Sequence, residues 1–216
     1  MAEKKRDDLV GTLYLQLKDM ILSGELSPGE KLIQEDLARK LVVSRTPLLR
    51  ALMMLEGDML VKSIPRRGMY VRKMNLSELR DAFQLRNSVE SMCCALAAQR
   101  AKAQDIAELR AIFEPFRDKL DHADPREYQM ADQAFHAKLL ELSGNQIVQQ
   151  MPLVSNIVKF TYQMGLIRFP RSTYEEHQRI IDAIEAGDPQ AAEETMRVHL
   201  GASIDSLEKR IETEGA

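Results

Sequence analysis

Apolar residues recur every three or four positions over most of the chain from residue 77 onward, which is the spacing of amphipathic helices. Prolines and short stretches rich in Gly, Asn and Asp interrupt this pattern and mark helix boundaries. The predicted helices cover 77–101, 104–121, 125–143, 145–169, 173–186 and 189–213. Six helices joined by short turns predict an antiparallel helical bundle.

The segment 32–71 has a different pattern. Two short helices are predicted over about 32–41 and 44–56, with Ser44 as the N-cap of the second and Pro47 in its first turn. The second helix would bury Leu48, Ala51, Leu52 and Leu55. Period-two alternation over 59–64 and 69–73 then predicts two strands joined by Pro65-Arg66-Arg67-Gly68. The fold class is therefore mainly α: a winged helix-turn-helix domain over 1–75, then an all-α bundle over 76–216.

Cationic and hydroxyl side chains gather at the start of the second short helix and in the hairpin turn. A helix-turn-helix points the start of its second helix into the major groove, and a basic turn can grip phosphates. The alternative is a small helical subdomain with solvated arginines, but a basic helix followed by a basic hairpin favours DNA. The candidate DNA contacts are Ser44, Arg45, Thr46, Arg50, Arg66, Arg67 and Gly68.

The net charge of −3 hides an asymmetry. Residues 1–75 hold 14 Lys and Arg against 10 Asp and Glu, and residues 76–216 hold 16 against 23. A basic head on an acidic body is typical of a DNA-binding module joined to a second domain. No stretch approaches the ~20 apolar residues of a membrane span, and the first residues lack the apolar run of a signal peptide. We therefore expect a cytoplasmic protein that does not enter a membrane.

The two cysteines, Cys93 and Cys94, are adjacent, which suits neither a disulfide framework nor a zinc finger. On a helix they point about 100° apart, so burial of at least one is expected.

Three of the four histidines fall on apolar helical faces. His177 lies ten residues before Gly187 and His199 ten after Pro189, so a hairpin folded there brings both to the same height. Asp132 and His136 are an i, i+4 pair that can present a carboxylate and an imidazole to one ion. We therefore predict a divalent metal bound by these four residues, with zinc as the first choice and nickel, manganese or iron as alternatives. The competing interpretation is a set of hydrogen-bonded core histidines, which a buried carboxylate makes less favourable. His122 lies in a polar loop and is expected to be solvated.

Residues 32–71 resemble the winged helix-turn-helix of the GntR family of bacterial transcription regulators, whose pattern is close to Ser-Arg-Thr-Pro-Val-Arg-Glu-Ala-Leu followed by Pro-Arg-Arg-Gly. The resemblance places Arg45 and Thr46 at its DNA-contacting positions and Arg67 and Gly68 at the tip of its wing. This chain departs from the pattern with Leu49-Arg50 in place of Arg-Glu, and a shift of one residue turns a helical side chain by about 100°. Val42 stands where the family often has Gly, and a β-branched residue resists a left-handed backbone.

Residues 77–205 resemble the FCD effector domain of the FadR-like branch of these regulators. The resemblance is carried by Phe135-His136, Leu142-Ser143-Gly144-Asn145, Glu176-His177 and the run from Ala183 to Leu200. It implies that Asp132, His136, His177 and His199 are metal ligands, that Arg86 lies near a bound carboxylate and that Asn145 is on the pocket side. Six helices rather than seven favour the shorter subgroup of these domains.

Together the two resemblances imply a homodimeric repressor or activator without enzymatic activity. Its partners would be a palindromic double-stranded DNA operator and a small carboxylate effector. Two alternatives stay open: a metal sensor that needs no organic effector, and an enzyme in which an open metal position activates water.

Overall fold

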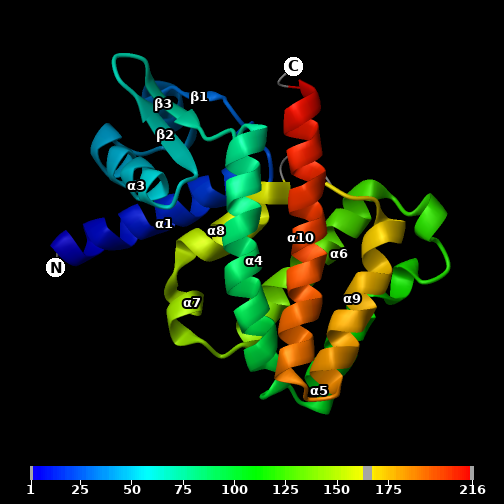
Figure 1. Ribbon diagram of the computed structural model, residues 1–216. Helices are drawn as coiled ribbons and strands as arrows, with labels where there is room; N and C mark the ends of the chain where they lie inside the picture. The colour runs from blue at the N-terminus through cyan, green and yellow to red at the C-terminus, as the bar shows by residue number, and fades with distance from the viewer. Residues whose placement is uncertain (1, 163–166, 215–216) are drawn as a thin grey trace. The chain divides into compact units, whose positions relative to one another are not determined.

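Helices make up most of the secondary structure in both parts of the chain (Figure 1). The structure is a computed structural model that describes residues 2–162 and 167–214. The chain divides into two units, Met1–Lys73 and Met74–Ala216. Within the described ranges, none of the helices combines the length and apolar character that crossing a membrane requires.

The first unit contains three helices and a small antiparallel sheet in its described residues. In chain order these are α1 (Ala2–Leu22), β1 (Lys31–Leu32), α2 (Gln34–Lys40), α3 (Arg45–Gly57), β2 (Val61–Ile64) and β3 (Gly68–Val71). The strand order is β1-β3-β2. Helix α3 buries Leu48, Ala51, Leu52 and Leu55, as its apolar spacing predicted, and it packs against α1.

The sequence did not predict β1. The first short helix was expected from residue 32, but Leu32 pairs with Met69 of β3 and the helix begins at Gln34. A two-residue strand is too short to show a period, and its conformation depends on the partner strand rather than on local preference.

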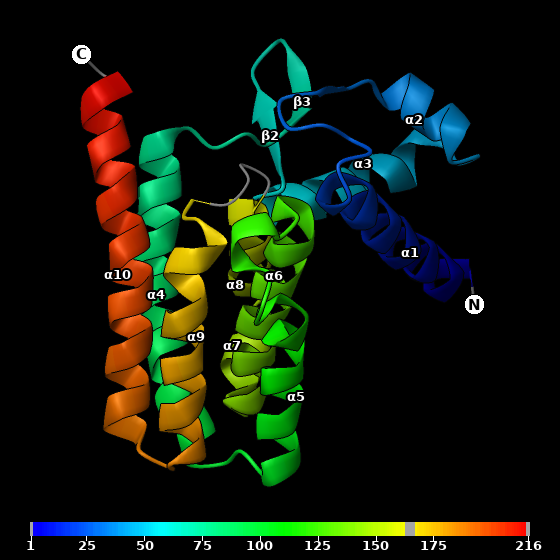
Figure 2. The same ribbon diagram turned by 90° about the vertical axis from the view of Figure 1, so that its right-hand side faces the viewer.

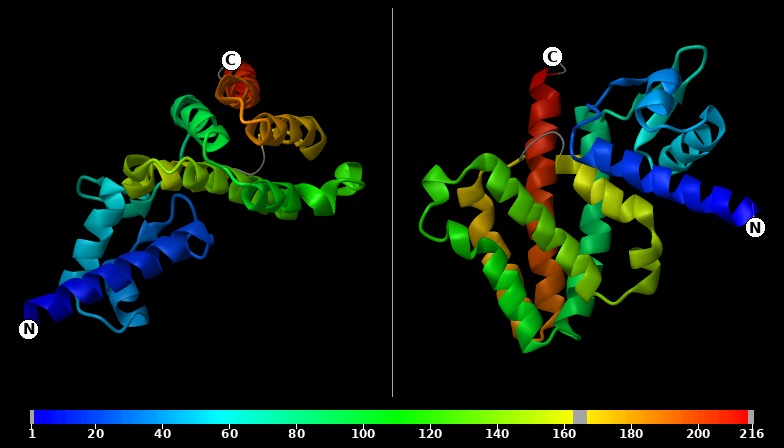
Figure 3. Two further views of the ribbon diagram at one scale, coloured as in Figure 1. Left: turned by 90° about the horizontal axis from the view of Figure 1, so that it is seen from below. Right: turned by 180° about the vertical axis from the view of Figure 1, so that it is seen from behind.

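The second unit is a bundle of helices. Its elements are α4 (Leu76–Ala98), α5 (Ala103–Phe113), the 3₁₀ turns η1 (Glu114–Phe116) and η2 (Leu120–His122), α6 (Pro125–Leu142), α7 (Gln146–Gln150), α8 (Pro152–Thr161), α9 (Pro170–Glu185) and α10 (Pro189–Glu214). Figures 2 and 3 show two layers, with α4, α9 and α10 in one and α5 to α8 in the other. The long helices α4 and α10 run side by side in opposite directions.

The start of this bundle agrees with the sequence. The Asn75 side chain accepts a hydrogen bond from the Glu78 backbone, and the Glu78 carboxylate accepts one from the Asn75 backbone. This reciprocal pair is a capping box, and it begins α4 one residue before the predicted start of the helix at residue 77. Cys93 and Cys94 are both buried in α4, which confirms the expected burial of at least one.

Two predicted helices are divided in the structure. The helix expected over 145–169 breaks into α7 and α8 because Met151 precedes Pro152 and takes an extended conformation, as residues before proline prefer. Its segment 163–166 lies outside the described residues. The helix expected over 104–121 ends at Phe113 and continues as 3₁₀ turns, since Pro115 has no N–H for the helical ladder. The described part of the bundle therefore has seven α-helices rather than six, which removes the argument for the shorter FCD subgroup.

The corner between α2 and α3 has a strained residue. Val42 has φ +54° and its side chain is 89% exposed, so little packing compensates for the left-handed backbone. Val42 therefore adopts the left-handed conformation that a β-branched residue resists.

We expect Val42→Gly to stabilise the first unit by roughly 0.5–1 kcal/mol, because relief of the left-handed strain exceeds the entropy lost by glycine. Scanning calorimetry of the full chain should show the transition of that unit at a higher temperature. Val42→Ala is the matched control, since alanine keeps Cβ and most of the strain. Equal gains from both substitutions would contradict this explanation.

Candidate metal centre and nucleic-acid interface

Four buried side chains from three helices converge inside the second unit. Asp132 and His136 come from α6, His177 from α9 and His199 from α10, and each offers a ligand atom within 4.8 Å of the others. The rings of His177 and His199 have their centroids 4.6 Å apart. This is the juxtaposition expected from the i, i+4 pair and the hairpin at Gly187.

Two of the histidines form a hydrogen bond with a carboxylate through Nδ1, the ring nitrogen that faces away from the cluster. His136 Nδ1 lies 2.5 Å from Glu90 Oε2, and His199 Nδ1 lies 2.7 Å from Glu176 Oε2. An ionised carboxylate only accepts hydrogen bonds, so both Nδ1 atoms carry the proton and donate it. In a neutral imidazole this leaves the lone pair on Nε2, which is the arrangement found in metal-bound histidines.

Two atoms at the centre of the cluster lack a well-aligned hydrogen bond. His177 Nε2 and Asp132 Oδ1 are 2.9 Å apart, yet among the described residues neither has a hydrogen-bond partner of good geometry. The other oxygen, Asp132 Oδ2, accepts a hydrogen bond of 2.6 Å from the Tyr162 hydroxyl. Unsatisfied buried polar atoms are costly, and one carboxylate with three imidazoles is a donor set that divalent metals accept. These residues therefore fit a divalent ion.

Burial also sets the protonation states that an ion requires. It lowers the pKa of His136, His177 and His199, which keeps the imidazoles neutral near pH 7. Burial raises the pKa of Asp132, but the facing histidines, His177 first, outweigh it and hold that pKa well below its usual value. The cluster is thus in the deprotonated form that binds metal.

Arg86 of α4 is joined to the same cluster through Glu90. Its Nε donates to Glu90 Oε1 over 2.6 Å and its Nη1 to Thr161 Oγ1 over 2.9 Å. Burial raises the pKa of Glu90, but Arg86 and then His136 outweigh it and lower that pKa to about 2. Arg86 Nη2 is buried and, within the described part of the chain, has no hydrogen-bond partner. One donor of the guanidinium is therefore left unsatisfied.

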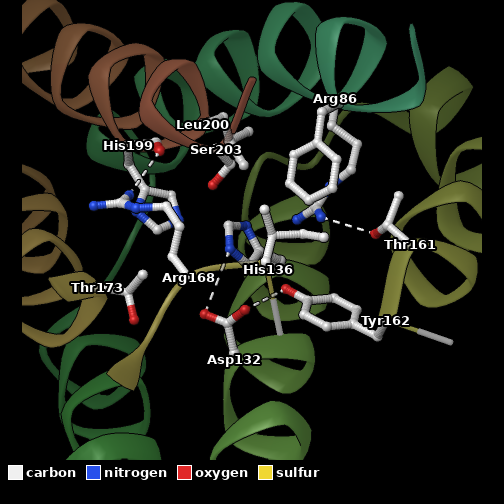
Figure 4. A pocket seen from close by; sticks show the side chains of 12 residues that line it. Arg86, Asp132, His136, Thr161, Tyr162, Arg168, Thr173, His199, Leu200 and Ser203 are labelled. Atoms are coloured by element: carbon white, nitrogen blue, oxygen red, sulfur yellow. Dashed lines mark hydrogen bonds and ion pairs between the residues drawn. The ribbon is translucent and has the colours of Figure 1, made fainter. Parts of the chain in front are cut away.

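A second arginine–carboxylate pair lies on the other side of the pocket. Glu176 accepts from Arg168 through both oxygens, at 2.5 and 2.7 Å. Partial burial raises its pKa, but hydrogen bonds from His199 and Arg168 outweigh this and lower it to about 2. Figure 4 shows Arg86, Asp132, His136, Tyr162, Arg168 and His199 around the pocket, whose cavity is about 30 Å³.

The structure separates the predicted pocket residues into two groups. Arg86 lines the pocket, whereas Asn145 does not: its side-chain oxygen accepts from the Ile147 and Val148 backbones and caps α7. In this structure the side chain of Asn145 therefore acts as the N-cap of α7. His122 is exposed, as predicted.

The charged and hydroxyl side chains that hydrogen-bond to the cluster or to its carboxylates were not all predicted, and those missed include Glu90, Tyr162, Arg168 and Glu176. A signal existed for Glu90, which lies one helical turn after Arg86 on the buried face of α4.

The candidate DNA contacts all lie on the surface of the first unit. Arg45, Thr46 and Arg50 are exposed on α3, and Ser44 occupies its N-cap without a side-chain capping bond. Arg66, Arg67 and Gly68 are exposed where β2 turns into β3. Arg45 pairs with Glu35 of α2 at 2.5 Å, an exposed contact worth no more than about 1 kcal/mol, which a phosphate or base could replace.

We expect removal of the Glu90 charge to destabilise the bundle far more than removal of the Glu176 charge. Glu90→Gln leaves the charge of Arg86 without its partner, and the Arg86 side chain is only 2% exposed. Breaking such a buried ion pair costs about 3–5 kcal/mol. Glu176 is 20% exposed, so water can solvate Arg168 once the carboxylate is removed. Glu176→Gln should therefore cost about 1 kcal/mol. Urea unfolding followed by circular dichroism measures both. Similar losses would show that the buried pair is not the stronger constraint.

Comparison with known proteins agrees with both units. Residues 9–71 match the family described as bacterial regulatory proteins, gntR family, and residues 81–202 match the FCD domain. An HTH-type transcriptional regulator of Streptomyces ambofaciens is 32% identical, over 91% of this chain and 84% of its own length. The Nta operon transcriptional regulator of Aminobacter aminovorans is 31% identical, over 74% and 76%.

Solved structures share the fold. A GntR regulator from Rhodococcus has a TM-score of 0.73 at 22% identity and covers 92% of this chain and 96% of its own. E. coli McbR/YncC has a TM-score of 0.70 at 23% identity and covers 94% and 98%. The relatives are named transcriptional regulators, not enzymes. This chain therefore belongs to the GntR family of DNA-binding transcription regulators, with a GntR helix-turn-helix domain followed by an FCD effector domain.

Proposed function

We propose that this regulator binds a palindromic operator as a homodimer and that its FCD domain holds a divalent metal and a small carboxylate effector. The metal ligands would be Asp132, His136, His177 and His199. The observation that carries the proposal is the convergence of their four ligand atoms within 4.8 Å, with Asp132 Oδ1 and His177 Nε2 lacking aligned hydrogen bonds in the described structure. Three imidazoles favour zinc, with nickel, manganese or iron as alternatives.

The charges around the pocket support an effector with one carboxylate. Arg86 cancels Glu90 and Arg168 cancels Glu176, so with neutral histidines Asp132 carries the one uncompensated charge among the described residues around the pocket. A divalent ion would change the net charge of the site from −1 to +1. A metal there supplies positive charge and an open coordination position for an acid oxygen. A monoanion would then neutralise the centre.

The size of the pocket also supports a small effector with one carboxylate. A cavity of about 30 Å³ favours a small ligand over a large one. Arg86 Nη2 is a buried donor left for an incoming acceptor. Both features support a short monocarboxylate or hydroxy acid over a long dicarboxylate.

DNA binding is assigned to α3 and the β2–β3 turn. Ser44, Arg45, Thr46 and Arg50 would enter or flank the major groove, while Arg66, Arg67 and Gly68 would contact phosphates or the minor groove. The symmetry of a homodimer would be mirrored by two half-sites in the operator.

The direct test is an anisotropy titration of the full chain with duplex DNA from the region next to its own gene. The protein is used metal-free, zinc-loaded, and zinc-loaded with acetate, lactate or succinate. We expect a specific complex whose affinity changes when zinc and a monocarboxylate are both present. A change with zinc alone would favour a metal sensor without an organic effector. No specific complex at low or moderate salt, with folded protein, would refute the proposal.

Metal loading should raise the melting temperature of the wild type. Ligand binding to the folded state alone stabilises it by about 2.7 kcal/mol at a hundredfold excess over Kd. His199→Ala should lose most of this shift, because three ligands remain and a cavity is left. His122→Ala removes an exposed histidine and serves as the control, with an unchanged shift. A wild type that melts at the same temperature with chelator and with excess zinc would identify the cluster as a hydrogen-bond network.

The metal-dependent part of this shift should also disappear in acid. The imidazoles must be neutral to bind, and free histidine gains a proton as pH falls through about 6.5. Because burial lowers the pKa of the three histidines, their contribution to stability is present above pH 6.5 and is lost below it as the unfolded chain takes up protons. Melting curves between pH 5 and pH 8 measure both effects.

Arg86→Lys should weaken binding of the acid while leaving metal content intact. Lysine keeps the charge beside Glu90 but loses the planar guanidinium with its spare Nη2. Loss of a hydrogen bond to a charged group costs about 1.5–3 kcal/mol, so affinity should fall at least tenfold. Calorimetry on zinc-loaded protein with acetate, lactate and succinate measures this. Equal affinity of variant and wild type would exclude Arg86 from the effector site.

A further inference from the structure

The outward face of α3 has an apolar strip among its polar residues. Leu48, Ala51, Leu52 and Leu55 point into the core, and the opposite face presents Thr46, Leu49, Arg50 and Met53. Leu49 is 40% exposed and Met53, one turn further on, is 60% exposed. Leu49 and Met53 are thus exposed apolar side chains at i, i+4 spacing on the helix that the family uses to contact DNA, and Met54 beside them is 46% exposed.

The chemistry of the major groove limits what such side chains can recognise. Of the four bases only thymine presents a methyl group there, whereas guanine, cytosine and adenine are distinguished by their hydrogen-bonding atoms. An apolar side chain placed against a polar base edge buries that edge without a partner, which is unfavourable. Against a thymine methyl it buries apolar surface instead.

The position of Leu49 favours it over Met53 as the residue that reads the base. In helix-turn-helix proteins the N-terminal residues of the second helix contact base edges. Leu49 is the fifth residue of α3, close to Arg45 and Thr46, whereas Met53 lies about 6 Å further along the axis. Leu49 also has fewer side-chain rotamers to lose than a methionine.

We propose that Leu49 is a specificity-determining residue that selects thymine in each operator half-site through its 5-methyl group. This inference rests on DNA binding by α3 and does not depend on the metal or the effector. Base recognition would then include an apolar contact by Leu49, close to the cationic and hydroxyl side chains of Arg45, Thr46 and Arg50.

Deoxyuridine provides the test, because it pairs as thymine does but lacks the methyl group. The full chain first selects duplexes from a random library, and each thymine of the selected site is then replaced singly by deoxyuridine. We expect one replacement per half-site to weaken the wild type about fourfold, the value of one buried methyl group. Leu49→Ala should bind both duplexes equally, since the partner of the methyl group is gone.

Two further variants sharpen the result. Leu15→Ala makes the same change at a leucine of α1 that is 64% exposed, and it should keep the wild-type sensitivity to deoxyuridine. Leu49→Arg should select guanine at the thymine position, because arginine donates to guanine O6 and N7. Both changes are on the surface, and melting curves verify that the variants fold.

The outcomes separate this inference from the proposed function. A selected site in which no deoxyuridine weakens the wild type refutes thymine reading by Leu49 and leaves DNA binding standing. A deoxyuridine effect that persists in Leu49→Ala also refutes it. If the folded wild type selects no sequence at all, the proposed sequence-specific regulator and the inference fail together.

Discussion

The buried carboxylate of Glu90 is the constraint on which the arrangement of the bundle core depends. A carboxylate without water must be matched by donors and positive charge. Arg86 supplies the charge from one turn earlier on α4, and His136 supplies an N–H from α6. The position of α4 relative to α6 is therefore tied to the protonation of one imidazole. A change in any of these three groups would alter the hydrogen bonding of the other two.

The same bonds determine what the cluster can do. Glu90 accepts a hydrogen bond from Nδ1–H of His136, which leaves the Nε2 lone pair of that ring directed toward Asp132. Glu176 fixes the tautomer of His199 in the same way. The carboxylates hold the imidazoles in the tautomer that a metal needs without being ligands themselves. Polar groups that stabilise the core and groups that would bind the ion thus form one network.

The sequence predicted most helices and the four-residue cluster because both follow from local spacing. The capping box at Asn75 and the hairpin at Gly187 are signals within a few residues, and so is the Asp132–His136 pair. The strand at Leu32 and the hydrogen bond between Glu176 and His199 depend on distant partners, which spacing does not reveal. Asn145 has a local role that its position after Gly144 also signals, because its side chain caps α7.

The candidate ligands come from α6 and from the hairpin of α9 and α10, with a long stretch of chain between α6 and α9. An ion held there would join three helices as a reversible staple, comparable to a cross-link that closes long loops in the chain. Unlike a disulfide, this staple would open and close with the supply of metal in the surroundings. Resistance of the protein to proteolysis would then follow metal availability, which would make the abundance of the regulator, as well as its activity, responsive to metal.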